Sequence, residues 1–200
     1  VGSGSMMGAS GQSNSNNTAV GYYSLKAITT GSNNTALGFN AGYSITTPQN
    51  AVAIGSYSNE QNTTGWSNVA IGGEAIRYNQ TGENNVAIGR QAMLGVSGNS
   101  HSNNTAVGTF ALKVITTGGS NVAVGYQSLF SITTGSSNVA IGASALKDTT
   151  SNTQNVAIGV SAGENITSNN NVAIGYQANA LATTGNSNSS MGYRALRYNV

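Results

Sequence analysis

Residues 138–142 read Asn-Val-Ala-Ile-Gly, and this string, or a close variant of it, recurs along the whole chain. Its glycine returns at a dominant interval of 17 residues, with single intervals of 13, 16 and 19. A fixed period of this length is the signature of a repeat architecture, in which each repeat folds as the same unit. The twelve repeat glycines are Gly8, Gly21, Gly38, Gly55, Gly72, Gly89, Gly108, Gly125, Gly142, Gly159, Gly175 and Gly192.

The residues before each repeat glycine alternate in size with a period of two, as in Val139, Ala140 and Ile141. This alternation and the β-branched residues predict a short strand with one large-residue face and one small-residue face. The frequent Gly and Asn and the missing 3.6-residue period argue against a helix. We predict that the large face fills the interior of the fold, through Val52, Ile54, Val69, Ile71, Val86, Ile88, Val139, Ile141, Val156, Ile158, Val172 and Ile174.

Ten residues after the repeat glycine comes a turn residue, Gly in six repeats and Asn in three, for which we predict a left-handed backbone. Pro48 takes this place once and cannot adopt a positive φ, so that corner should differ locally. One repeat is then strand, bend, short second strand and turn, which suits one coil of a parallel β-solenoid. We predict an all-β β-roll of about twelve coils, roughly 55–60 Å long, with residues 1–200 forming one repeat domain. Because the chain begins and ends inside a repeat, it is expected to be a segment of a longer fibrous protein.

Asparagine stands four residues before the glycine in nearly every repeat, with Ala51 as an exception. Stacked coils would align these amides into a ladder of side-chain hydrogen bonds. In the alternative interpretation each Asn only satisfies its own turn. The predicted ladder comprises Asn68, Asn85, Asn104, Asn121, Asn138, Asn155 and Asn171.

The composition removes several function classes. Only 12 of 200 residues are charged, the net charge is +2, and there are one His and no Cys. So few cations make a poor nucleic-acid footprint, and the missing Cys excludes disulfides and thiolate metal sites. No apolar stretch of 18 residues exists, so membrane insertion is not expected. The five acids are too scattered for a catalytic pair, so we expect no enzyme activity, no metal and no cofactor.

Two columns and one histidine have competing interpretations. Five residues after the glycine, cations recur, and they either form a solvated edge or contact an anionic surface glycan. Aromatic residues directly after the glycine either stack at a trimer seam or coil corner, or bind sugar rings. His101, in the 19-residue repeat, is expected on a solvent-exposed bulge, with a ligand or pH role as the alternative. The cations are Lys26, Arg77, Lys113, Lys147 and Arg197, and the aromatics are Tyr22, Phe39, Tyr126, Tyr176 and Tyr193.

The units Asn17-Thr-Ala-Val-Gly-Tyr-Tyr-Ser-Leu25 and Asn121-Val-Ala-Val-Gly-Tyr-Gln-Ser-Leu129, each followed by Ile-Thr-Thr-Gly after two further residues, resemble repeats of phage tail fibres. Those fibres often end in a cleavable intramolecular chaperone. The Asn-Val-Ala-Ile-Gly core is also similar to head repeats of trimeric autotransporter adhesins, although the period there is somewhat shorter. The resemblance implies a left-handed, homotrimeric parallel β-roll, placed outside the cell on a virion or a bacterial surface.

We therefore expect a shaft or head segment of a trimeric fibre that spaces and presents a receptor-binding tip, with weak glycan contact along its side. A bacterial adhesin head is the alternative within the same resemblance. An ice-binding solenoid is the alternative from another class, because a Thr column follows the glycine by eight residues: Thr29, Thr46, Thr63, Thr116, Thr133, Thr150, Thr167 and Thr183. In each Thr-Thr pair the two threonines are adjacent in sequence, so on a strand their side chains would point to opposite faces. A face with two parallel rows of Thr, as ice binding would need, is therefore not expected.

Overall fold

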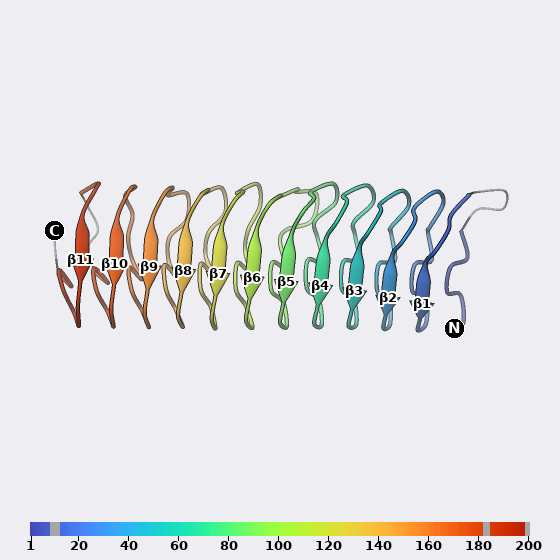
Figure 1. Cartoon of the computed structure of the whole chain (residues 1–200), viewed down its shortest axis with the longest axis horizontal. Helices are drawn as coiled ribbons and strands as arrows, with labels where there is room; N and C mark the ends of the chain where they lie inside the picture. The colour runs from blue at the N-terminus through green and yellow to red at the C-terminus, as the bar shows by residue number, and fades with distance from the viewer. Residues whose placement is uncertain (9–12, 182–184, 199–200) are drawn as a thin grey trace.

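The computed structural model describes residues 1–8, 13–181 and 185–198, and within them it is all-β. Eleven three-residue strands pair in parallel, each with the next along the chain, in one sheet. Figure 1 shows them side by side along the long axis, with the two termini at opposite ends. The strands are β1 (Thr18–Val20), β2 (Thr35–Leu37), β3 (Val52–Ile54), β4 (Val69–Ile71), β5 (Val86–Ile88), β6 (Thr105–Val107), β7 (Val122–Val124), β8 (Val139–Ile141), β9 (Val156–Ile158), β10 (Val172–Ile174) and β11 (Ser189–Met191).

The pairing register confirms the predicted parallel solenoid and its 17-residue repeat. Val122 pairs with Val139 and Ala123 with Ala140, so equivalent residues form columns along the axis. The 19-residue repeat keeps this register, because Ala87 still pairs with Ala106. The two extra residues are therefore accommodated outside the strand, and the sheet continues past them.

The prediction of the interior face is wrong, because the small face points inward. In β7 Ala123 is fully buried, whereas Val122 and Val124 are only half-buried on the outer side. The same pattern holds in β3 to β5 and β8 to β10, where Ile88, Ile141 and Ile158 are 39%, 39% and 37% exposed. The residues corrected in this way are Val52, Ile54, Val69, Ile71, Val86, Ile88, Val139, Ile141, Val156, Ile158, Val172 and Ile174.

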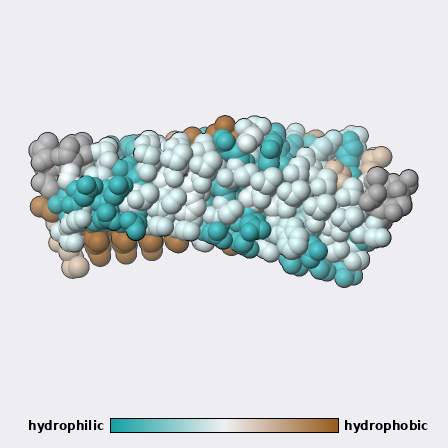
Figure 2. Space-filling view, turned by 90° about the horizontal axis from the view of Figure 1, so that it is seen from above, coloured by the Kyte–Doolittle hydropathy of each residue, from teal (hydrophilic) through white to brown (hydrophobic). Residues whose placement is uncertain are grey.

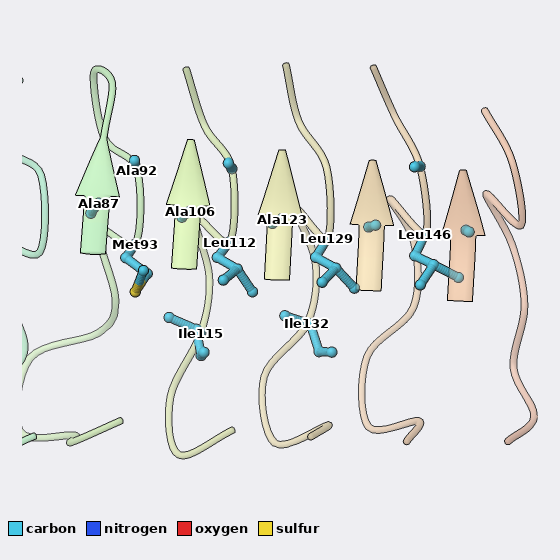
Figure 3. Close-up of a cluster of buried hydrophobic side chains, with 14 of the residues drawn as sticks. Ala87, Ala92, Met93, Ala106, Leu112, Ile115, Ala123, Leu129, Ile132 and Leu146 are labelled. Atoms are coloured by element: carbon cyan, nitrogen blue, oxygen red, sulfur yellow. The ribbon is translucent and has the colours of Figure 1, made fainter. Parts of the chain in front are cut away.

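The interior is narrow, and the segment opposite the strand supplies its large side chains. Leu112, Leu129 and Ile132 are fully buried and reach toward the alanine column, as Figure 3 shows. In each coil the segment opposite the strand places about two large side chains in the interior. Because protein interiors are close-packed, the strand then has room to contribute only the methyl group of an alanine. A β-branched side chain on the inner face would overpack each coil.

The predicted asparagine ladder is confirmed. Asn138 donates its backbone N–H and its side-chain Nδ2 to Asn121 Oδ1, both at 3.0 Å. Asn121 Nδ2 donates in turn to Asn104 Oδ1 at 3.1 Å and to the carbonyl of Gly135 at 2.9 Å. Each amide thus satisfies buried backbone groups of the next coil, which leaves few orphaned polar groups in the interior. All seven predicted members, from Asn68 to Asn171, are buried.

The one natural gap in this ladder is compensated. At Ala51 no side-chain amide is available for the carbonyl of Gly65. Asn62, which takes the place of a buried isoleucine, donates Nδ2 to that carbonyl at 2.9 Å and accepts from the Gly65 N–H at 2.8 Å. Asn79 makes the same two bonds with Gly82, at 3.0 and 3.1 Å, although the ladder residue Asn68 also donates to that carbonyl. An Asn in this column therefore binds its own turn glycine whether or not the ladder is complete, and at Ala51 this bond serves the carbonyl that a ladder Asn at that position would bind.

Removing a ladder amide without such compensation should be costly. Asn121→Ala orphans the buried carbonyl of Gly135 and the buried N–H of Asn138, at about 1–3 kcal/mol each. We expect the free energy of unfolding, measured by urea denaturation, to fall by about 2–5 kcal/mol. Ser97→Ala, which removes an exposed hydroxyl, is the control and should change it by less than about 0.5 kcal/mol. Equal effects of the two variants would contradict the structural role of the ladder.

The glycines are required for different reasons in different columns. Gly125 has a φ of 133°, and a Cβ there would lie 2.6 Å from the carbonyl oxygen of Gly142 in the next coil. Gly135, one of the predicted turn glycines, does not have a positive φ, so the predicted left-handed turn is wrong there. Its Cβ would instead collide with the carbonyl of Asn152. Pro48 fits this column, and its carbonyl accepts from Asn34 Nδ2 at 2.8 Å as the glycines do, so the corner does not differ as predicted.

Candidate functional site

The outer face of the sheet carries three largely apolar columns, whose polar members are Thr18, Thr35, Ser56, Arg90, Thr105, Thr109 and Ser189. The columns stand three and one residues before the repeat glycine and one residue after it, and we call them together the outer strand face. Val20, Leu37 and Met191 are 41%, 47% and 78% exposed there. From Thr18 to Tyr193 the face includes one charged residue, Arg90. Figure 2 shows part of it as an apolar row along one edge of the C-terminal half.

The outer strand face is comparable in size to the largest apolar patches of monomeric proteins. Ten strand spacings of about 4.8 Å and four residues of about 3.3 Å give a strip of roughly 50 by 13 Å, or about 650 Å². Polar residues occupy part of this strip, so its apolar area is smaller and comparable to the largest apolar patch on a typical monomer, about 300–600 Å², which is often functional. This face is the main candidate for a functional surface.

The aromatic residues after the repeat glycine extend the outer strand face. Tyr22 stacks on Phe39 with ring centroids 5.5 Å apart, and Tyr176 stacks on Tyr193 at 5.3 Å. Tyr126, 52% exposed, meets the ring of Phe110 edge-on. The five predicted aromatics therefore lie at the surface, and four of them stack on the equivalent residue of the neighbouring coil.

The cation column lies on a lateral edge, and most of its members are satisfied by neighbouring coils. Arg77 forms ion pairs with Glu60 at 2.6 Å and Glu74 at 3.6 Å. Lys147 lies 3.9 Å from Glu164. These pairs are only half-buried, so each contributes little stability, and they neutralise this part of the edge.

The two ends of the column have no carboxylate. Lys26 donates to the hydroxyl of Tyr43 at 2.9 Å, and this hydrogen bond raises the pKa of Lys26. Arg197 has its guanidinium carbon 5.1 Å from the ring centroid of Tyr198. Lys113, in the middle of the column, lies between two phenyl rings. The five predicted cations thus share an edge without forming one continuous positive surface.

The prediction that His101 lies on an exposed bulge is wrong. Its side chain is among the fully buried ones, and neither ring nitrogen has a hydrogen-bond partner. The backbone of His101, by contrast, is satisfied: its N–H donates to Asn79 Oδ1 at 3.1 Å and its carbonyl accepts from Asn85 Nδ2 at 2.8 Å. Desolvation by burial lowers the pKa of His101 to about 4. Val96 stands seven residues after its repeat glycine, where other coils bury an isoleucine, but here it is exposed. In this longer repeat His101 is buried in the interior and Val96 is not.

The threonine column makes hydrogen bonds within the fold. Thr29, Thr46 and Thr63 each donate the hydroxyl to a carbonyl of the next coil. Thr116 and Thr133 do the same, while Thr183 lies outside the described residues. These donors are committed to the backbone, which weakens the ice-binding alternative.

The described residues contain no pocket and no group of three metal-binding side chains close enough to hold an ion. They also contain no helix that is long and apolar enough to cross a membrane. Glu60 and Glu74, which the sequence places in different columns, approach each other only through their shared partner Arg77.

In comparisons with known proteins, no family model, no curated protein and no solved structure matches this chain.

Proposed function

We propose that the chain is a shaft segment of a homotrimeric extracellular fibre, on a virion or a bacterial surface. The observation that carries the proposal is the outer strand face, which is largely apolar and almost free of charge along eleven strands. Such a surface is unfavourable in water and favourable against a second apolar surface. The repeat resemblance to tail fibres and adhesin heads adds a left-handed coil and three copies around one axis, and the twelve repeat glycines of the sequence correspond to about twelve coils.

A second copy of the same chain is the partner that suits this face best. The columns run from coil to coil at one spacing, so two or three parallel copies can match coil to coil along their length. In an assembly with closed cyclic symmetry, the outer strand face of every copy is covered by another copy. The interior supports the same conclusion, because it is narrow and offers few large side chains per coil. Additional burial between copies would stabilise each coil further.

In this role the solenoid is a spacer. Its hydrogen-bonded amide ladder and its continuous sheet join each described strand to the next, which resists bending and the local opening that a protease needs. It holds a receptor-binding tip away from the particle or cell and makes weak glycan contact along its side. A tail-fibre shaft and an adhesin head place the same demands on this segment, so both owners fit the proposal.

The solution mass tests the proposal. Light scattering after size exclusion should give about 60 kDa, three times the chain mass of 20.1 kDa. Ile141→Asp together with Ile158→Asp places charges on the outer strand face and should lower the mass to that of one chain. Glu83→Gln, which changes an exposed residue outside this face, is the control. A mass of about 20 kDa for the unmodified chain would contradict the trimer.

A further inference from the structure

We propose that Arg90, Phe110, Lys113, Tyr126 and Phe130, which we call the Phe110 cluster, form a binding site for a carboxylated sugar. Both cations lie against one ring, with the Arg90 guanidinium carbon 5.6 Å and Lys113 Nζ 4.9 Å from the Phe110 centroid. Lys113 Nζ also lies 5.5 Å from the centroid of Phe130. The inference rests on the proposed function, whose side contact with glycan it makes specific.

The Phe110 cluster carries uncompensated positive charge. The described residues form three ion pairs, and none includes Arg90 or Lys113. Neither side chain donates a hydrogen bond to another described residue. The rings attract both cations but neutralise neither, so two like charges share one ring. An anion placed between them would relieve this repulsion.

Arg77, Arg194 and Lys26 also lie against aromatic rings, but each has a further partner. Arg77 lies 4.5 Å from the ring centroid of Tyr57, but two carboxylates already neutralise it. Arg194 donates to Gln177 Oε1 at 3.1 Å. Lys26 lies against two rings, as Lys113 does, but it is hydrogen-bonded to a hydroxyl of one of them.

The position of the rings points to a sugar. Phe110 meets Tyr126 at 6.1 Å and Phe130 at 6.5 Å, both edge-on, and Tyr126 is half exposed. An aromatic platform suits the apolar C–H face of a pyranose ring. Arginine beside it suits a carboxylate, which it can bind through two parallel hydrogen bonds. A phosphate polymer needs many cations and no aromatic platform, and this cluster has only two cations.

The backbone holds the cluster on three successive coils. The Phe110 N–H donates to the carbonyl of Arg90 at 3.1 Å, and the Val114 N–H donates to the carbonyl of Phe130 at 3.2 Å. The site is therefore built on the regular coil register and needs little ordering when a ligand binds. Phe110, Lys113 and Phe130 lie outside the three columns of the outer strand face, whereas Arg90 and Tyr126 stand in its last column, one residue after the repeat glycine. The site therefore requires copies to meet through the two columns before the glycine and to leave this last column accessible.

Titration calorimetry at low salt tests the site with two probes, a hexuronic acid oligomer and a sialylated oligosaccharide. At least one should bind, and the methyl ester of the bound probe should bind at least tenfold more weakly. The double variant Arg90→Ser with Lys113→Ala should bind that probe at least tenfold more weakly than the unmodified chain. Ser56 and Ala180 occupy the equivalent positions of other coils, so the fold should tolerate both changes. Lys26→Gln, the matched control, should keep the unmodified affinity.

The aromatic contribution has its own variant. Phe110→Gln should weaken binding about fivefold, and Gln127 has a similar backbone conformation at the equivalent position, with a φ of 54°. No binding of either probe, or unchanged binding by the double variant, would overturn the site. If polyphosphate bound with the same affinity as the sugar and Phe110→Gln did not change that affinity, binding would depend on charge alone, and this would also overturn the site. The solution mass of the same samples separates the two proposals, because a trimer that binds no sugar overturns the site alone.

Discussion

Ala123→Asp is expected to abolish the folded solenoid. Ala123 is fully buried in the middle of β7, between Ala106 and Ala140 in the flanking strands. The carboxylate would enter a narrow apolar interior with no cation to pair with it, at a cost of several kcal/mol. Domains are stable by only about 5–15 kcal/mol, so one such charge can consume most of the stability. Circular dichroism during heating would show the loss of the β signal and of the cooperative unfolding transition.

The neighbouring residue provides the matched control. Val122→Asp introduces the same charge one residue earlier on the same strand, but on the half-exposed outer side. It should leave the β signal in place, although it weakens association between copies. If Val122→Asp unfolded the chain and Ala123→Asp did not, the two faces of the strand would be assigned the wrong way round.

Acid is expected to destabilise the fold through His101. The folded pKa is about 4 and the ordinary value is 6.5, so the unfolded chain takes up a proton that the folded chain refuses. The stabilisation is complete above pH 6.5, falls as the pH drops below that value, and is lost below pH 4. The shift of about 2.5 pKa units corresponds to about 3 kcal/mol. Urea denaturation at pH 7, 5.5 and 4 would measure it.

His101→Leu isolates this contribution from that of the carboxylates. Leucine removes two ring nitrogens that have no partner and keeps a large apolar group among buried neighbours. The variant should be at least as stable at pH 7 and should lose about 3 kcal/mol less than the unmodified chain between pH 7 and pH 4. An unchanged pH dependence would show that His101 is not the group that titrates.

The sequence predicts the strand register of this fold correctly, but it does not predict which residues fill the interior. The fixed spacing of the repeat glycines indicates a parallel solenoid, and the recurring Asn predicts the ladder seen between Asn121 and Asn138. Alternation of Val139, Ala140 and Ile141 establishes two faces but does not say which one is buried, because both are apolar. The buried Leu and Ile opposite the strand, such as Leu129 and Ile132, hold that information, since they leave room only for alanine.

Two features of the candidate sites also depend on three-dimensional neighbours. His101 enters the interior because its repeat is longer by two residues, and the spacing alone does not show which residue of the insertion turns inward. Phe110 lies two residues after a repeat glycine, in a column where aromatics are not regular, so its contacts with Arg90 and Lys113 are apparent only from the structure. Lys113 belongs to the cation column that the sequence predicts, whereas Arg90 stands in a different column.

A distance between spin labels tests most directly whether copies meet at the outer strand face. The chain has no Cys, so Ile141→Cys and Thr134→Cys each give one labelled site, on the outer strand face and at an exposed turn. Sheets that pack face to face lie about 10 Å apart, so pulsed electron resonance of the assembled protein should give a short distance between copies, below about 20 Å, for residue 141 and a clearly longer one for residue 134. No distance between copies at residue 141, or a shorter one at residue 134, would contradict assembly through this face.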